Sequence, residues 1–175
     1  MTTVKENASV NGDVSVVATG TAWVGSGVGS VNTAIENMLR KATTEVQIAV
    51  YDMTGGADEF LVMVRGLLAR GIPVTLVVNR FDKKGTKLKD GLNGLAARYR
   101  HFGLYDFAPR DEMEDLHAKV VVRDRAEALI GSANLTWRGM VLNHELAVIV
   151  SGTAASTVAR LIDDLARDPR VRRVT

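Results

Sequence analysis

A histidine and a lysine stand two residues apart at the start of a strand-like segment, His117-Ala-Lys119-Val-Val-Val-Arg-Asp124. Strand interiors disfavour lysine, so packing alone does not explain this pair. Side chains of a strand alternate between its two faces, and His117 and Lys119 therefore point the same way. Asp124 comes seven residues after His117, so an unbroken strand would place it on the opposite face.

Three more polar residues stand at the ends of the next two strand-like segments. Ser132 and Asn134 share a face where one segment ends, and Glu145 opens the other. If the strand ends meet, the donors of Lys119, Ser132 and Asn134 suit phosphate oxygens. A neutral histidine is a nucleophile or base, and a carboxylate can fix its tautomer. The set predicts phosphoryl transfer through His117, with fixed charges on the equatorial oxygens.

The same residues make a poor metal site, because a lysine repels cations and no cluster of carboxylates or histidines offers ligands. The chain has no cysteine, which excludes disulfides and thiolate metal sites. Residues 20–30 are glycine-rich but lack the GxGxxG and GxxxxGK[ST] patterns of nucleotide sites. We interpret them as a strand-to-helix connection at the rim of the site, and backbone amides that cradle a phosphate are the alternative. We therefore predict no metal and no cofactor.

Apolar periodicity alternates between strand and helix along the 175 residues. It predicts strands over residues 14–20, 45–51, 74–78, 104–107, 118–122, 128–132 and 145–150. It predicts helices over 31–42 (with a Thr33–Glu36 capping box), 60–68, 88–102 (stopped by Gly103) and 158–165. This order predicts an α/β fold, with a mixed β-sheet flanked by helices on both faces, in a single domain over residues 1–175.

The composition is that of a globular protein, with 46% hydrophobic and 24% charged residues. A net charge of +2 favours polyanionic partners only weakly. No apolar run approaches the roughly 20 residues of a membrane helix, and the polar N-terminus shows no signal peptide. We expect a cytoplasmic protein without membrane contact.

The spacing His117-x-Lys119-x4-Asp124-x6-Gly131-Ser132-x-Asn134 resembles the HxKxxxxD signature of the phospholipase D superfamily. Glu145 sits where single-motif bacterial nucleases of that superfamily carry an acidic residue. The resemblance implies that His117 forms a phosphohistidine, that Lys119, Ser132 and Asn134 bind phosphate oxygens, and that Glu145 orients the histidine. It implies a structural role for Asp124. Arg125 departs from the family, which often has glycine there.

The resemblance also implies a partner, because the superfamily uses two such motifs and the second histidine protonates the leaving oxygen. This chain has one copy, and neither His101 nor His144 is followed by a lysine two residues later. His144 also faces away from Glu145. We therefore expect a phospholipase D-like half-unit that forms a two-fold homodimer around one shared site.

Basic residues concentrate in the segment 80–101, with seven cations against two carboxylates. Such a segment can follow a nucleic-acid backbone, and a solvated helix face is the equally weighted alternative. The carboxylates of Asp111, Glu112, Glu114 and Asp115 form either a gating loop or, as we favour, a solvated turn. The candidate nucleic-acid-binding residues are Arg80, Lys83, Lys84, Lys87, Lys89, Trp137 and Arg138.

The leading hypothesis is a metal-independent phosphodiesterase, a DNA endonuclease of the phospholipase D superfamily that favours DNA over RNA. One alternative is the nuclease or nucleic-acid-binding subunit of a larger antiviral defence complex. The other is a phospholipid phosphodiesterase or transferase, which the lack of an apolar lid or membrane-binding helix weakens.

Overall fold

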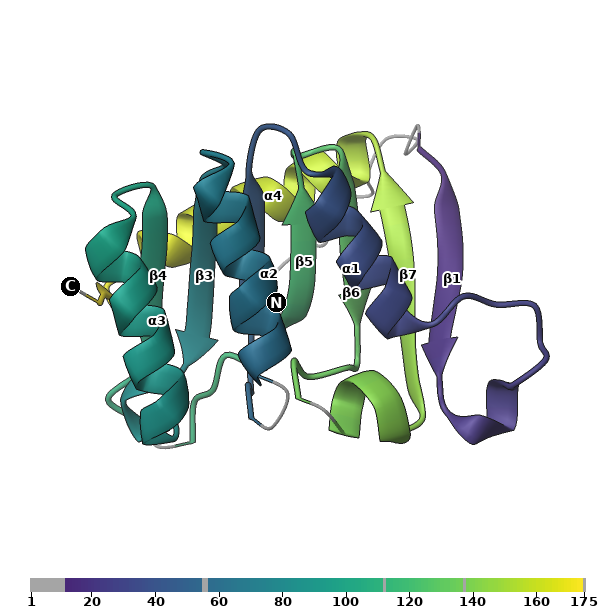
Figure 1. Cartoon of the computed structure of the whole chain (residues 1–175), viewed down its shortest axis with the longest axis horizontal. Coiled ribbons are helices and arrows are strands. Elements are labelled where there is room, and N and C mark those ends of the chain that lie inside the picture. Colours follow the sequence, from purple (N-terminus) through teal and green to yellow (C-terminus); the bar gives the residue numbers. More distant parts are fainter. Residues whose placement is uncertain (1–11, 55–56, 112, 137, 175) are drawn as a thin grey trace, which may run out of the picture.

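The computed structural model describes residues 12–54, 57–111, 113–136 and 138–174. Within them, one mixed sheet has the strand order β1-β7-β6-β5-β2-β3-β4-β8 (Figure 1). The pairs β2–β3 and β3–β4 are parallel, and every other neighbouring pair is antiparallel. The strands are β1 (Val14–Thr19), β2 (Val46–Val50), β3 (Val74–Asn79), β4 (Phe102–Phe107), β5 (Lys119–Arg123), β6 (Glu127–Gly131), β7 (Glu145–Ser151) and β8 (Val171–Arg173).

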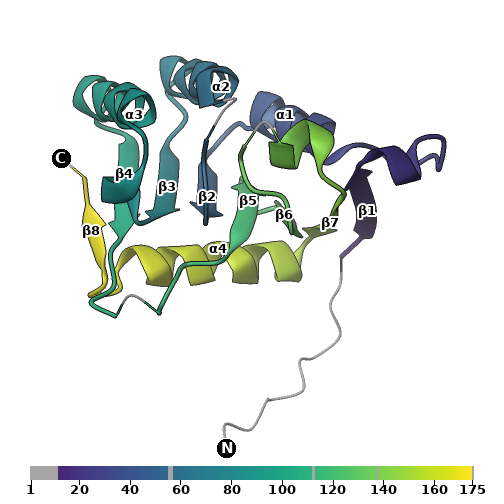
Figure 2. The ribbon, with the colours of Figure 1, turned by 90° about the horizontal axis from the view of Figure 1, so that it is seen from below.

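Helices cover both faces of this sheet, which confirms the predicted α/β architecture. One face carries α1 (Val31–Lys41), α2 (Ala57–Ala69) and α3 (Thr86–Arg98), and α4 (Thr153–Ala166) crosses the other (Figure 2). Short turns lie between these elements: the 3₁₀ helices η1 (Thr21–Trp23) and η2 (Phe81–Lys83), and the π-helical turn η3 (Arg138–Leu142). Among the helices of the described residues, none combines the length and the hydropathy that crossing a bilayer requires.

Alternation along the central strands produces two apolar layers. Ile48, Leu76 and Val121 pack toward α1–α3, whereas Ala49 and Val77, one residue further along their strands, pack toward α4. Because β2 lies in the middle of the sheet and is covered on both faces, all of its residues are buried. A strand in that position reads as a nearly continuous apolar run rather than an alternating one.

The first helix begins at a different cap from the predicted one. The Ser30 hydroxyl accepts a hydrogen bond from the Thr33 N–H at 3.1 Å, which makes Ser30 the N-cap of α1. The predicted Thr33–Glu36 capping box is therefore wrong, because the helix starts one turn earlier.

Two further boundaries near the C-terminal half differ from the prediction. The third helix ends at Arg98, and Phe102 opens β4 rather than closing the helix. Phe102 and Leu104 alternate into the α1–α3 layer, which is the strand period. The C-terminal segment, for which the periodicity predicts no strand, contains β8, which pairs with β4. Arg172 in β8 pairs with Asp106 at 3.2 Å.

Strand direction brings the predicted site residues to one edge of the sheet. Since β5 and β7 run against β2 and β6, the first residues of β5 and β7 lie at the same edge as the carboxyl ends of β2 and β6. The ends of β3 and β4 lie there as well. We call this the site edge. The turn that contains Asp124, after the far end of β5, lies at the opposite edge.

Candidate active site

His117 and Lys119 contact each other at the site edge. His117 is exposed and lies two residues before β5, whereas Lys119 is the first residue of β5 and is buried. The Lys119 ammonium lies 3.2 Å from His117 Nε2 and donates to the His117 carbonyl at 2.9 Å. An ammonium only donates, so the first contact requires an unprotonated Nε2 and leaves the ring proton on Nδ1. An unprotonated ring nitrogen thus lies beside a cation and accepts its hydrogen bond.

Burial lowers the pKa of the Lys119 ammonium, and the charge of Glu145 opposes this effect. The carboxylate of Glu145 is therefore close enough to influence Lys119, although it begins another strand. Within the described residues, no hydrogen bond joins Glu145 to His117. Glu145 instead accepts from the Ser132 hydroxyl and, at 3.2 Å, from the Asn143 amide.

A glycine permits the Ser132–Glu145 pair. A Cβ atom at Gly131 would lie 2.4 Å from the Ala147 Cβ and 2.7 Å from the Leu146 carbonyl oxygen, so only glycine fits there. The close approach lets the Ser132 N–H donate to the Leu146 carbonyl at 3.1 Å and the Leu146 N–H donate to the Ser132 hydroxyl at 3.2 Å. The Gly-Ser sequence therefore fixes the hydroxyl against β7.

Asn134 lies two residues further, where the chain leaves the sheet. Its Oδ1 atom is buried and has no hydrogen-bond partner among the described residues. Gly139 of η3 packs against its backbone, since a Cβ there would lie 2.6 Å from the Asn134 carbonyl oxygen. Buried amide oxygens are normally paired, so this oxygen is left able to accept a hydrogen bond from a donor.

One aromatic residue that the sequence analysis did not select lies against the histidine. The Tyr51 ring, just after β2, has its centroid 4.7 Å from that of His117, with the planes tilted by 58°. The Lys119 Nζ atom lies over the same ring, 5.1 Å from its centroid. Tyr51 is the last residue of the strand predicted over residues 45–51, which was a signal in the sequence, but its contact with the His117 ring depends on tertiary packing.

Asp124 lies at the opposite edge, where it binds the backbone ahead of β2. It accepts hydrogen bonds from the N–H groups of Thr43, Thr44 and Glu45 and from the hydroxyls of Thr43 and Thr44. Burial raises the pKa of Asp124, but the backbone donors of Thr44, Glu45 and Thr43 outweigh burial and lower the pKa to about 2. Asp124 thus joins the start of β2 to the end of β5.

Arg125 adopts the left-handed backbone conformation (φ 53°) that favours glycine. Its guanidinium forms ion pairs with Glu45 and, at 2.8 Å, with Asp163 of α4. These pairs connect the turn to β2 and α4. They supply a reason for arginine at a position where the backbone alone would prefer glycine.

The candidate nucleic-acid-binding residues differ in how they are held. Arg80 binds Asp115 at 2.8 Å and the carbonyls of Asp111 and Glu114. Lys84 pairs with Asp52 at 2.8 Å, and Lys89 donates to the Asp82 carbonyl at 3.0 Å. Lys83, Lys87 and Arg138 are exposed, and Lys83 and Lys87 also have interactions with other residues. Trp137 lies outside the described residues.

The acidic segment before His117 is bound by arginines. The hydrogen bond from Arg80, followed by that from Asn79, lowers the pKa of Asp115. Arg170 forms an ion pair with Glu114. Glu112 lies outside the described residues. A groove of about 800 Å³ runs beside the segment, lined by Arg80, Asp82, Lys83, Ala108, Pro109, Arg110, Asp111, Glu114, Pro169, Arg170 and Arg172.

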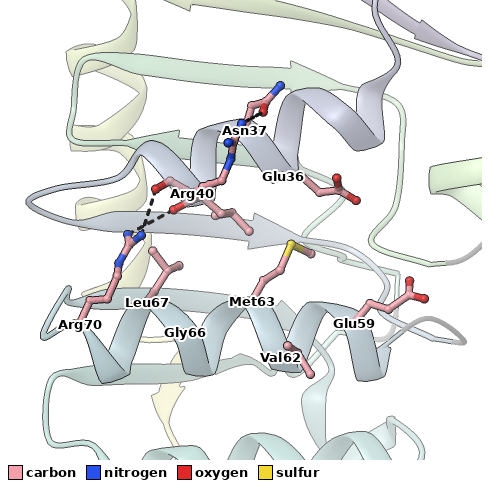
Figure 3. A pocket seen from close by; sticks show the side chains of 10 residues that line it. Glu36, Asn37, Arg40, Glu59, Val62, Met63, Gly66, Leu67 and Arg70 are labelled. Atoms are coloured by element: carbon pink, nitrogen blue, oxygen red, sulfur yellow. Dashed lines mark hydrogen bonds between the residues drawn. The ribbon is translucent and has the colours of Figure 1, made fainter.

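A second groove, of about 740 Å³, lies between α1 and α2 (Figure 3). Arg70, the residue after α2, closes one end by donating to the carbonyls of Arg40 and Ala42, at 3.0 and 2.8 Å. None of the predicted site residues lines it. Within the described residues, no three histidine or acidic side chains gather closely enough to hold a metal ion.

Comparisons with known proteins point to one family. Residues 35–168 match the family described as "Cardiolipin synthase, PLD-like domain". Over 134 residues the chain is 23% identical to the "DISARM protein DrmC" of Bacillus paralicheniformis, covering 77% of this chain and 55% of that protein. The chain thus spans about half the length of this curated relative.

Solved structures share the fold at low sequence identity. Nuc of Salmonella typhimurium, a phospholipase D family member, superposes with a TM-score of 0.73 at 19% identity, over 94% of this chain and 99% of that one. NucT of Helicobacter pylori superposes with a TM-score of 0.71 at 15% identity, over 90% of this chain and 97% of that one.

The Asp124 cluster generates a prediction about acid stability. A pKa lowered to about 2 in the folded state lies below the unfolded value, so this carboxylate stabilises the fold above pH 4 and ceases to do so as the pH falls toward 2. We expect Asp124→Asn to reduce the free energy of unfolding at pH 7 by about 2 kcal/mol, and the difference from wild type to shrink in acid.

Urea unfolding at a series of pH values measures this difference. The matched control is Asp90→Asn, which neutralises an exposed carboxylate on α3 and should change the stability by less than about 0.5 kcal/mol. Equal effects of the two substitutions at pH 7 would show that the cluster does not stabilise the fold.

Proposed function

The chain belongs to the phospholipase D-like family, and on this premise we propose that it is a phosphodiesterase that cleaves DNA through a phosphohistidine on His117. The observation that carries the proposal is the contact between the Lys119 ammonium and His117 Nε2. It supports a nucleophilic nitrogen next to a cation that can bind the phosphate under attack.

In the proposed reaction, His117 Nε2 attacks phosphorus and forms a P–N bond while the P–O bond to the leaving group breaks. Lys119 and the amide N–H groups of Asn134 donate to the non-bridging oxygens as their charge rises. The Ser132 hydroxyl joins them by turning its single proton from Glu145 to the phosphate. Water then attacks phosphorus and gives its proton to the group that protonated the leaving oxygen, the P–N bond breaks, and His117 is regenerated. The role of Asn134 as a donor rests on its amide N–H groups, because its buried Oδ1 atom can only accept a hydrogen bond.

Glu145 acts in this proposal through Ser132 and Lys119. Its carboxylate accepts from the Ser132 hydroxyl, which fixes the hydroxyl beside β7. Its charge favours the ammonium form of Lys119 against the effect of burial. Since no hydrogen bond joins Glu145 to His117 within the described residues, the proposed role of Glu145 in orienting a histidine falls to the Nδ1 proton of the second copy's His117.

The leaving oxygen requires a proton, and the other histidines of the chain are engaged elsewhere. His101 Nε2 lies 3.0 Å from the Leu68 carbonyl, and the His144 ring accepts from the Ala22 N–H at 3.1 Å and packs against Trp23. We therefore propose that His117 of a second copy supplies the proton, in a two-fold homodimer with one shared site.

Apolar side chains around the site edge support this association. Val141 and Leu142 of η3 are 49% and 50% exposed, and Leu146, next to Glu145, is 50% exposed. A second copy that brings its own site edge close would cover them. Burial of such side chains is the main driving force of protein association.

Charge and family both bear on the substrate. The basic segment 80–101 favours a polyanion, although Arg80 and Lys84 are bound within the chain. The structural relatives Nuc and NucT share the fold, whereas the family description names a phospholipid-synthesising enzyme. A phospholipid substrate is therefore the competing proposal within the same chemistry.

The curated relative favours one further proposal. Its name describes it as a DISARM protein, and this chain covers about half of it. We propose that the chain can also act as the nuclease subunit of a larger assembly. DNA binding without cleavage by the isolated dimer would favour this role.

The central prediction concerns cleavage without metal. We expect the wild-type protein to cleave plasmid or single-stranded DNA in excess EDTA, and His117→Ala to reduce the rate by roughly 10³-fold or more, because the nucleophile is lost. Gel assays of DNA cleavage measure this, and circular dichroism checks that the variant is folded. Phosphatidylcholine and phosphatidylglycerol vesicles test the competing substrate. Equal cleavage by wild type and His117→Ala would contradict the mechanism.

A second prediction concerns the dimer. We expect Leu142→Asp to make the protein monomeric at micromolar concentration and to abolish cleavage, because a desolvated carboxylate opposes association. The control is Val62→Asp, at an exposed valine (57%) in the groove between α1 and α2. Analytical ultracentrifugation measures the oligomeric state of the wild type and of both variants. A wild-type protein that is monomeric and still cleaves DNA would refute the shared site.

A further inference from the structure

We propose that Tyr51 is a positioning residue for the nucleophile, and that Lys84 and Asp52 hold Tyr51 in turn. This inference rests on the proposed function in assigning the nucleophile to His117, but the contact itself can be tested without activity. Tyr51, Asp52 and Lys84 are outside the HxKxxxxD motif, and they come from the end of β2 and the residue after η2.

The sheet places Tyr51 beside the motif. Val50, the last residue of β2, pairs with Lys119, the first residue of β5. The next residue of β2 therefore leaves the sheet alongside the segment that carries His117. A tyrosine there presents its ring to the imidazole, with centroids 4.7 Å apart and planes tilted by 58°. This spacing is within the range of favourable aromatic contacts.

Two ammonium groups lie over the same ring. The Nζ atoms of Lys119 and Lys84 are 5.1 Å and 5.8 Å from the Tyr51 centroid. The face of an aromatic ring is electron-rich and attracts cations at these distances. The Tyr51 ring thus contacts both His117, the proposed nucleophile, and Lys119, the proposed phosphate-binding cation. It holds the two side chains next to each other.

Lys84 fixes the turn that carries Tyr51. Its ammonium donates to the Tyr51 carbonyl at 3.1 Å and to the Asp52 carboxylate at 2.8 Å. Only 13% of the Lys84 side chain is exposed. The same Asp52 oxygen accepts from the N–H of Met53, which is fully buried. The geometry therefore favours an anchoring role for Lys84 over binding of DNA.

The Tyr51 contact matters because His117 is exposed, and apart from Tyr51 its ring is held by Lys119 at the Nε2 atom. A nucleophile held in its reactive orientation loses less freedom on reaching the transition state. When Nε2 forms the P–N bond, the imidazole that keeps its Nδ1 proton gains positive charge, and the ring of Tyr51 stabilises that charge. Both effects act on the chemical step rather than on substrate binding.

The test compares Tyr51→Leu with Tyr51→Phe in the full chain, using bis(p-nitrophenyl) phosphate in EDTA so that DNA binding plays no part. We expect Tyr51→Leu to lower kcat about tenfold with KM changed less than about twofold, and Tyr51→Phe to restore kcat because it keeps the ring. In histidine-labelled protein, the ring-proton signals of His117, assigned with His117→Ala, should lose their upfield ring-current shift in Tyr51→Leu and keep it in Tyr51→Phe.

A second variant tests the anchor and does not remove the ring. Lys84→Met should move the same His117 signals and lower kcat, whereas Lys41→Met, which removes one positive charge at the end of α1, should do neither. Unchanged His117 signals in both Tyr51→Leu and Lys84→Met would overturn the proposal, even if no phosphodiester is cleaved. Shifted signals with an unchanged kcat would also overturn it. If the wild-type protein cleaves no phosphodiester but the His117 signals shift in the variants as expected, the proposed function would be overturned and the ring contact would stand.

Discussion

Gly131 lets β6 and β7 approach each other at the point where the candidate site needs them closest. Any side chain at that position would collide with Ala147 and with the backbone of Leu146. The approach allows the hydroxyl of Ser132 to meet the carboxylate of Glu145, whose charge then reaches Lys119 on β5. The electrostatics of the site therefore depend on a backbone spacing, and the spacing depends on the absence of a Cβ atom.

The sequence was enough to place the motif residues near one another, because this deduction uses only the alternation of side chains along a strand and the direction of neighbouring strands. His117, Lys119, Ser132 and Glu145 all lie within a residue or two of a strand end at one edge. What the sequence could not supply was the partner of each side chain. Ring packing on Tyr51 depends on the register of β2 with β5. The C-terminal strand β8 was missed because three residues give too short a pattern, and Phe102 continued a helical spacing by coincidence.

The basic segment shows a different limit of sequence analysis. Counting charges treats each of them as available to a ligand, yet Arg80 is bound to Asp115, 35 residues away, and Lys84 to Asp52, 32 residues away. These pairs join the loops after β2, β3 and β4 into one structure around His117. A charge excess in the sequence therefore overestimates the positive surface that a polyanion meets, because some of these cations are paired within the chain.

Asp124 belongs to the same sequence motif as His117 but lies at the other edge of the sheet, where it joins the beginning of β2 to the end of β5. The two residues thus belong to one sequence motif, although Asp124 stabilises the fold and His117 is the proposed nucleophile. In living cells, substitutions at Asp124 should behave as conditional alleles, with function returning at low growth temperature as the folded fraction rises. Substitutions at His117 should be null at every temperature and leave normal amounts of protein. Growth temperature would then separate the two halves of the motif without any purified enzyme.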